Sequence, residues 1–184
     1  MRLLRDFVVL PILRMKSIQR RMFGKLSQLH VHYRKSSLSH QEVKQGSHLK
    51  AGDRAPDVAF ESCDSHKRIT LFELLKGVRP VVLTGSDVPI LEPLRALELE
   101  AHRILRKSDR PTETSTGQWI DVHGDFEELY GMHGNFLCLI RPDGHIGLIQ
   151  NPVDRDSLEK YLGRICDPQK VEQVFTAGKN PPVL

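Results

Sequence analysis

The chain has few cysteines, and no two of them lie close together. Cys63, Cys138 and Cys166 are an odd number at wide spacings, so they form neither a disulfide framework nor a Cys/His pattern that could hold zinc. Cys138 lies in an apolar stretch and is expected to act as a small core residue. Because scarce cysteine fits a reducing compartment, we expect a cytoplasmic protein. A mitochondrial location is the minor alternative, since residues 1–35 are rich in arginine and poor in acidic residues.

Long hydrophobic runs and phosphate-binding glycine loops are also missing. No stretch approaches the roughly 20 apolar residues of a membrane span, and neither type of glycine-rich phosphate loop occurs. The nine histidines are scattered, and no spacing makes three or four of them converge, so we expect no metal site. Ser86-Asp87 lacks the flanking glycines of a nucleophile elbow. We expect four acidic residues to lie on a solvated face or to supply charges at a helix N-terminus: Asp121, Asp125, Glu127 and Glu128.

Positive charge is concentrated at the N-terminus. Residues 1–50 carry eleven Lys/Arg against Asp6 and Glu42, a net charge of +9, whereas the remainder carries sixteen basic and twenty-one acidic residues, a net charge of −5. The basic segment has no pattern of stacking aromatic residues beside its charges. We therefore expect no binding of nucleic acid.

An amphipathic helix is predicted within residues 1–35. Its apolar stripe recurs at helical spacing, with basic residues on the other faces, and consists of Ile18, Met22, Leu26 and Leu29. Such a stripe needs a cover, which could be another protein surface or an anionic membrane. The protein surface is favoured, because Pro11 and Gly24 weaken an isolated helix in water.

A compact domain is predicted at residues 53–167, between a serine-rich linker at 36–52 and a tail at 168–184. The expected elements are strand 58–61, helix 71–76, strand 81–84, a helix within 90–107, strand 119–122, a helical turn at 126–130, a hairpin of 136–140 with 145–149, and helix 157–165. This order predicts an α/β fold, a thioredoxin-like mixed sheet (β-α-β-α-β-β-α) preceded by the N-terminal helix.

Local signals mark two of these elements. Thr70 and Glu73 have the spacing of a capping box, and Gly77 stands where a C′ glycine would end the helix. Pro142-Asp143-Gly144 supplies the turn of the hairpin.

The disulfide chemistry of a redox thioredoxin is absent. Its CxxC would follow strand 81–84, where this chain has Gly85-Ser86-Asp87-Val88-Pro89, and its cis-proline would precede the hairpin, where this chain has Gly134-Asn135. We therefore reject thiol oxidoreduction. A peroxiredoxin-like enzyme is a distant alternative, for which Cys63 is the candidate thiol.

Several stretches occur together in a familiar order. They are SQLHVHYRKSSLS (Ser27–Ser39), AGDRAPDV (Ala51–Val58), LFELLKG (Leu71–Gly77), VVLTG (Val81–Gly85) and YGMHG with LIRPDGHI (Tyr130–Ile146). Over roughly residues 8–165 the chain resembles the C-terminal third of FAD-dependent aromatic-ring hydroxylases, the phenol or pentachlorophenol monooxygenase type of class A flavoprotein monooxygenase.

The resemblance implies a thioredoxin-like domain without active cysteines, preceded by the last helix of an FAD domain. In that family FAD and NAD(P)H are the cofactors, but the GxGxxG and second GD motifs that bind FAD do not occur here. We therefore expect no catalytic, cofactor-binding or metal residue, and no activity of the chain alone. The family's Trp-Arg ending of the second hairpin strand is replaced by Gly147-Leu148-Ile149.

The expected partner is a flavin domain, upstream or on a separate chain, or a second copy of this chain. The contact would be made by the stripe of Ile18, Met22, Leu26 and Leu29. The function implied is a non-catalytic accessory domain with a role in assembly or stability. The alternative from another class is a stand-alone interaction module that docks through its N-terminal helix.

Overall fold

The computed structural model describes residues 32–43, 49–86, 88, 91–109, 117–132 and 134–177. The chain divides into two units, Met1–His32 and Tyr33–Leu184, and the fold below is that of the second. The amphipathic helix expected within residues 1–35 lies almost wholly outside the described residues. No helix of the described part is long and apolar enough to cross a membrane.

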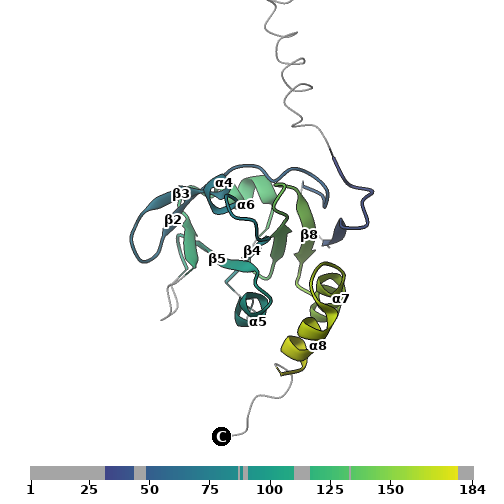
Figure 1. Cartoon of the computed structure of the whole chain (residues 1–184). Coiled ribbons are helices and arrows are strands. Elements are labelled where there is room, and N and C mark those ends of the chain that lie inside the picture. Colours follow the sequence, from purple (N-terminus) through teal and green to yellow (C-terminus); the bar gives the residue numbers. More distant parts are fainter. Residues whose placement is uncertain are drawn as a thin grey trace, which may run out of the picture. The chain divides into compact units, whose positions relative to one another are not determined.

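Eight strands of the described part form one mixed sheet in the order β1-β8-β7-β4-β5-β6-β2-β3 (Figure 1). The strands are β1 (His40–Val43), β2 (Ala59–Ser62), β3 (Arg68–Thr70), β4 (Val81–Thr84), β5 (Glu100–Arg106), β6 (Gln118–Asp121), β7 (Leu137–Ile140) and β8 (Ile146–Asn151). The helices are α4 (Leu71–Leu74), α5 (Leu91–Ala96), α6 (Asp125–Tyr130), α7 (Arg155–Ile165) and α8 (Pro168–Ala177).

The centre of the sheet has the predicted thioredoxin-like arrangement. β4 and β5 are parallel and are joined through α5, while β7 runs antiparallel to β4 on its other side. β8 pairs antiparallel with β7, and α7 follows it directly. The order β8-β7-β4-β5 therefore combines a parallel crossover unit with a terminal hairpin and helix.

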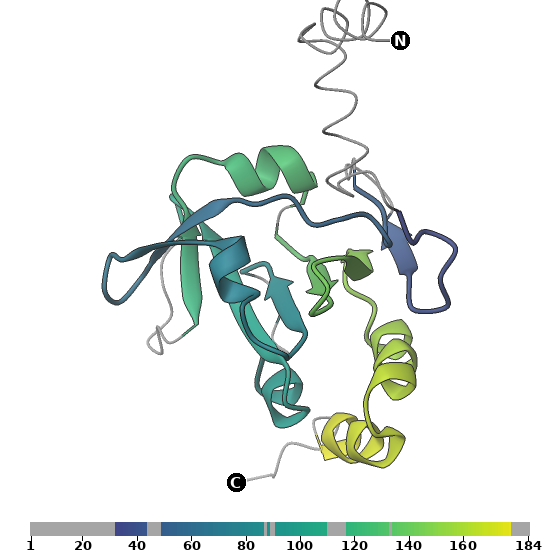
Figure 2. The same ribbon diagram turned by 45° about the horizontal axis from the view of Figure 1, so that its top comes forward.

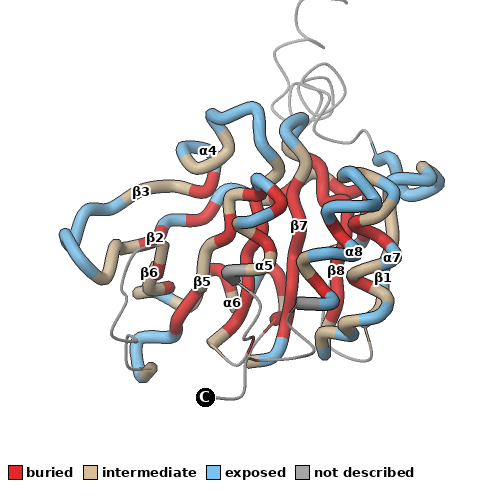
Figure 3. The backbone as a smooth tube through the Cα atoms, turned by 60° about the horizontal axis from the view of Figure 1, so that its bottom comes forward, coloured by how far each residue is buried: buried red, intermediate tan, exposed pale blue. Residues whose placement is uncertain are grey.

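Helices cover both faces of this sheet (Figures 1 and 2). The core on one face includes residues of α4 and α6, and the core on the other includes residues of α5, α7 and α8. Central strand β4 alternates between them: Val81 and Leu83 face the first core and Val82 the second. All three side chains have no exposed surface, and Figure 3 shows β4, β7 and β8 as a buried centre. Burial on both faces explains the continuous apolar runs of these strands.

Two local predictions are confirmed. The Thr70 hydroxyl accepts a hydrogen bond from the Glu73 N–H at 3.3 Å, and the Glu73 carboxylate accepts one from the Thr70 N–H at 2.9 Å, which completes the capping box. The hairpin turns at Pro142-Asp143-Gly144, where Gly144 has φ of 78°. The Gly77 prediction is wrong: α4 ends at the cap residue Leu75, and Gly77 has no positive φ.

The helix expected within residues 90–107 is shorter than predicted. α5 ends at Ala96, Glu98 takes a left-handed conformation with φ of 63°, and residues 100–106 form strand β5. The spacing of Leu97, Ala101 and Ile104 resembles a helical stripe. Pairing with β4 and β6 on both sides overrides this local pattern.

Two segments expected to lack structure contain elements. The predicted linker 36–52 contains β1, which pairs in parallel with β8, and the predicted tail 168–184 contains α8. β1 is mostly polar because His40 and Glu42 contact Ser157 of α7, while Val43 packs against the first core. α8 forms because Val171 and Phe175 are buried against the second core. Strand β3, which pairs with β2, was not predicted.

Three stretches far apart in sequence meet at one junction, which we define as Tyr33, Arg34, Gly52, Asp53 and His145. The Arg34 guanidinium donates two hydrogen bonds to the Asp53 carboxylate, at 2.6 and 2.9 Å. The Tyr33 N–H donates to the Gly52 carbonyl at 2.7 Å, and the Tyr33 ring packs edge-on against His145 with ring centroids 4.8 Å apart.

The junction also contacts the sheet. The Gly52 N–H donates to the Ile146 carbonyl at 2.7 Å, and the Ile146 N–H donates to the Asp53 carbonyl at 2.9 Å. Gly52 has φ of 92°, and a Cβ at this position would overlap the backbone of Tyr33 and Arg34. Glycine is therefore required by both the backbone conformation and the close approach of the two segments.

Gly52→Ala is expected to lower the free energy of unfolding by about 3 kcal/mol, because the new methyl group adds overlap to a strained backbone. The matched control is Gly163→Ala in α7, where a Cβ would meet nothing within 4 Å. That substitution is expected to raise stability by about 0.7 kcal/mol, since alanine is the better helix former. Urea denaturation measures the free energy of unfolding of both variants. Equal values for the two would contradict the junction geometry.

Candidate functional site

The end of β4, where a redox thioredoxin carries its thiols, is closed by backbone contact. The Gly85 N–H donates to the Phe136 carbonyl at 3.2 Å, and a Cβ on Gly85 would overlap the carbonyl oxygen of Gly134. The cavity beside Ser86 has a volume of about 20 Å³, which is room for about one water molecule.

Cys63, the candidate thiol of a peroxiredoxin-like enzyme, lies in the turn after β2. In the sheet order β2 is three strands from β4, a separation of about 14 Å at the usual strand spacing. Burial raises the pKa of the Cys63 thiol, and the nearby charges of Asp64 and Glu61 raise it further. The more nucleophilic thiolate form is therefore disfavoured at this position. Cys138 is fully buried as predicted, and burial raises its pKa to about 12.

Asp121 is not on a solvated face; it lies at the start of α6, which is the other role expected for it. It is 6% exposed, and its carboxylate accepts hydrogen bonds from the N–H groups of Phe126 and Glu127, both at 3.1 Å. The carboxylate therefore caps the start of α6, and burial raises its pKa. Asp125, Glu127 and Glu128 do lie in the first turn of α6, where negative charge is favourable.

Within the described ranges, no three His, Cys, Asp or Glu side chains gather as a metal site would require. His102 accepts a hydrogen bond at Nδ1 from the Trp119 indole at 3.1 Å. Its pKa is lowered to about 4, chiefly by burial and then by the charge of Arg95. His30, His48 and His133 lie outside the described residues.

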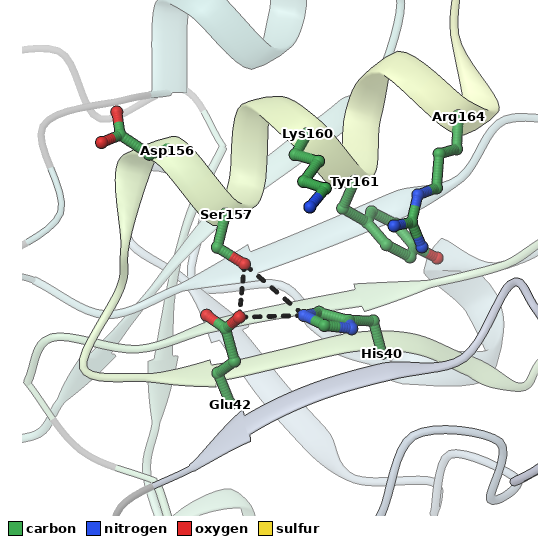
Figure 4. Close-up of a pocket in the computed structure, with 7 residues that line it drawn as sticks. All are labelled: His40, Glu42, Asp156, Ser157, Lys160, Tyr161 and Arg164. Carbon is green, nitrogen blue, oxygen red and sulfur yellow. Dashed lines mark hydrogen bonds and ion pairs between the residues drawn. The ribbon is translucent and has the colours of Figure 1, made fainter.

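A polar cluster that the sequence did not predict joins β1 to α7 (Figure 4). The Ser157 hydroxyl donates to Glu42 Oε1 at 2.6 Å, and His40 Nε2 lies 2.9 Å from the same oxygen. The other carboxylate oxygen of Glu42 accepts a hydrogen bond from Gln150 at 3.1 Å. Hydrogen bonds from Ser157 and then His40 hold the pKa of Glu42 below its ordinary value.

Ser157, His40 and Glu42 are the residue types of a hydrolase triad, but their arrangement is not catalytic. In a triad the serine donates to one imidazole nitrogen and the acid orients the other. Here Ser157 donates to the carboxylate, and His40 Nε2 faces both Glu42 at 2.9 Å and Ser157 at 3.5 Å. The serine is therefore not activated by a base, and the cluster serves to fasten an edge strand to a helix.

No sequence signal identified this cluster. His40 and Glu42 lie in a segment without the apolar alternation of a strand, and Ser157 follows 115 residues after Glu42. The contact exists because β1 pairs with β8 and thereby faces the start of α7. Such a long-range contact cannot be read from local pattern.

Comparison with known proteins gives a partial match. No family model matches the chain. A curated relative, a flavin-dependent monooxygenase of Mycobacteroides abscessus, is 28% identical over 141 residues, or 76% of this chain. The chain spans 23% of the length of that relative. The chain resembles part of an FAD-dependent aromatic-ring hydroxylase.

Solved structures give weaker likenesses. OxyS anhydrotetracycline hydroxylase of Streptomyces rimosus is 22% identical with a TM-score of 0.48, covering 84% of this chain and 27% of its own. The thioredoxin domain of a thiol-disulfide oxidoreductase from Bacteroides vulgatus is 16% identical with a TM-score of 0.47, covering 64% of this chain and 98% of its own. Because these scores are low, the fold assignment rests on the sheet order of the chain itself.

The stretches that carry the resemblance are placed where they build the fold. SQLHVHYRKSSLS and AGDRAPDV meet through Arg34 and Asp53 at the junction, and LIRPDGHI reaches it through His145. VVLTG is the central strand β4 with Gly85. These contacts are structural, and the described residues of the shared stretches form no catalytic arrangement.

Thiol labelling is expected to separate this chain from a thiol enzyme. Cys138 should stay unlabelled by a maleimide or iodoacetamide until the protein unfolds, because it is completely buried. Cys63 should react more slowly than free cysteine at the same pH, because its thiolate is disfavoured. Labelling followed by mass spectrometry measures both rates. Rapid modification of Cys63, together with turnover of peroxide, would contradict the structural account.

The neutral state of His102 is expected to make stability depend on pH. Its folded pKa of about 4 lies below the ordinary value of 6.5. As the pH falls between these values the unfolded state binds a proton that the folded state does not, so the free energy of unfolding decreases. The loss should total about 3 kcal/mol, since each unit of pKa difference is worth about 1.4 kcal/mol, and it should be absent above that range.

His102→Gln should remove this part of the pH dependence. The measurement is urea denaturation of both proteins across the acidic range, followed by fluorescence of Trp119, the single tryptophan of the chain. Parallel stability curves for the two proteins would show that His102 titrates normally in the fold.

Proposed function

We propose that this chain is a non-catalytic, thioredoxin-like accessory domain of an FAD-dependent aromatic-compound monooxygenase, and that it acts in assembly or stability. The observation that carries this proposal is the junction. The stretches that resemble the hydroxylases contribute the Arg34–Asp53 pair and the Tyr33–His145 contact, which order the domain. Partial coverage of the relative supports a piece of a larger enzyme.

The end of β4 does not fit FAD. A flavin dinucleotide exceeds drug-sized ligands, whose pockets measure about 300–1,000 Å³. The cavity at the end of β4 is about 20 Å³, and Gly85 is pressed against Gly134 there. Because the chain also lacks the GxGxxG and second GD motifs, we propose that FAD and NAD(P)H, the cofactors implied for the family, are bound by another part of the enzyme. This chain supplies no step of the reaction.

We propose a flavin domain as the partner, upstream in the same chain or on a separate one, with a second copy of this chain as the alternative. The contact would be made by Ile18, Met22, Leu26 and Leu29. An apolar stripe of this kind is stable only when it is covered. A stand-alone interaction module could use the same stripe. The identity of the partner therefore distinguishes such a module from an accessory domain of a monooxygenase. Free cysteines support a reducing compartment, which we propose is the cytoplasm.

Sequencing the transcript and genomic DNA upstream of the Met1 codon tests this function first. An in-frame continuation that encodes GxGxxG and the second GD motif is the expected result, because it would supply the missing flavin domain. A stop codon followed by independent start signals would contradict a fused domain. The flavin protein would then have to be a separate chain.

Leu26→Asp is expected to abolish association through the apolar stripe, because it would bury an unpaired charge. Gln28→Asp is the matched control, since it adds the same charge at a polar position outside the stripe. Size-exclusion chromatography with light scattering measures binding to the flavin domain, or self-association of this chain. Equal association of both variants would overturn the proposed contact. Binding to neither a flavin domain nor a second copy would favour the stand-alone module.

A further inference from the structure

A cavity of about 280 Å³ opens between β1 and α7 (Figure 4). Strand β1 contributes His40 and Glu42 to its lining, and α7 contributes Ser157, Lys160, Tyr161 and Arg164. The cavity is separate from the closed end of β4 and is not needed for the proposed function. It is large enough for a small molecule.

Two cations face this cavity from one side of α7. Lys160 and Arg164 are spaced i and i+4, which places them one turn apart on the same helix face. Figure 4 shows both side chains directed toward the hollow beside Tyr161 and His40. Neither forms an ion pair within the part of the chain that the structure describes. Their mutual repulsion is destabilising, and an anion placed between them would reduce it.

The acidic groups of the lining form no ion pair with these cations in the described residues. Glu42 keeps its negative charge, but its two carboxylate oxygens face Ser157, His40 and Gln150. Asp156 lies one turn before Lys160, but in Figure 4 its carboxylate points away from the hollow. The positive charge of Lys160 and Arg164 is therefore available to a ligand.

The wall of the cavity is fixed in place. The Tyr161 hydroxyl donates to the Leu38 carbonyl at 2.9 Å, and the Tyr161 ring stacks on His40 with an interplanar angle of 27°. A Cβ on Gly147 would meet the Tyr161 hydroxyl, so this glycine makes room for the contact. The hydrogen bond ties α7 to the segment before β1.

We propose that this cavity binds a small-molecule anion that carries a carboxylate or phosphate group, held by Arg164 and Lys160. The planar guanidinium can donate two parallel hydrogen bonds to such a group, and the ammonium adds a point charge. The stacked rings of Tyr161 and His40 line the remaining space. Because the site is open to solvent, its affinity decreases with rising ionic strength.

The test uses the full chain, labelled with ¹⁵N, and two probes, sodium phosphate and sodium succinate. Each is added at constant ionic strength, with sodium chloride as the reference. The expected result is a saturable change of amide chemical shifts confined to β1 and α7 for one or both probes. Arg164→Gln should weaken binding about tenfold, the usual loss for one charge-assisted hydrogen-bonded contact. Lys160→Met, which keeps the apolar stem, should weaken it in the same direction.

Lys67→Gln is the matched control, because it removes one positive charge at the β2–β3 turn, by the opposite edge of the sheet. It should leave the affinity unchanged. Shifts no larger than those caused by chloride would overturn the proposal, as would undiminished binding by Arg164→Gln. An equal loss in Lys67→Gln would assign the effect to net charge and would overturn it too. The flavin plays no part in this test, so its outcome is independent of the proposed function.

Discussion

The buried carboxylate of Asp53 connects parts of the chain that are far apart in sequence. It accepts two hydrogen bonds from Arg34 and one from the Lys50 N–H, while its own backbone carbonyl accepts from Ile146 at the start of β8. A carboxylate that is 5% exposed costs free energy unless each lone pair is used. Its position therefore fixes the segment before β1 against the terminal hairpin, and β1 pairs with β8 as a consequence.

The residues that hold the fold together are not those at the end of β4, where a redox thioredoxin carries its reactive thiols. The junction and the buried centre of the sheet preserve a thioredoxin-like arrangement, while the end of β4 is occupied by the contact of Gly85 with Gly134. A thioredoxin-like fold does not by itself imply a function, because reactivity depends on the few residues at the site. Lys160 and Arg164 of α7, which form no ion pair among the described residues, face a cavity whose other wall is the edge strand β1.

Much of the fold could be predicted where local pattern and tertiary structure agree. β4 and β7 are apolar on both faces, and Thr70 with Glu73 and Pro142-Asp143-Gly144 are short-range signals whose mechanism is local. β5 was predicted as helix because its apolar spacing fits either period, and only pairing with two neighbouring strands decides between them. β1 and the polar cluster around Glu42 were missed because their stabilising contacts come from residues more than 100 positions away.

The central claim is that this chain builds structure and leaves flavin chemistry to another part of the enzyme. The most direct measurement is to incubate the purified full chain with excess FAD, remove free flavin by gel filtration, and record the visible absorbance of the protein. The account predicts no retained flavin, because the sequence lacks the GxGxxG and second GD motifs that bind FAD in the family it resembles. Retention of one FAD per chain would contradict it and would show that this chain itself binds the cofactor.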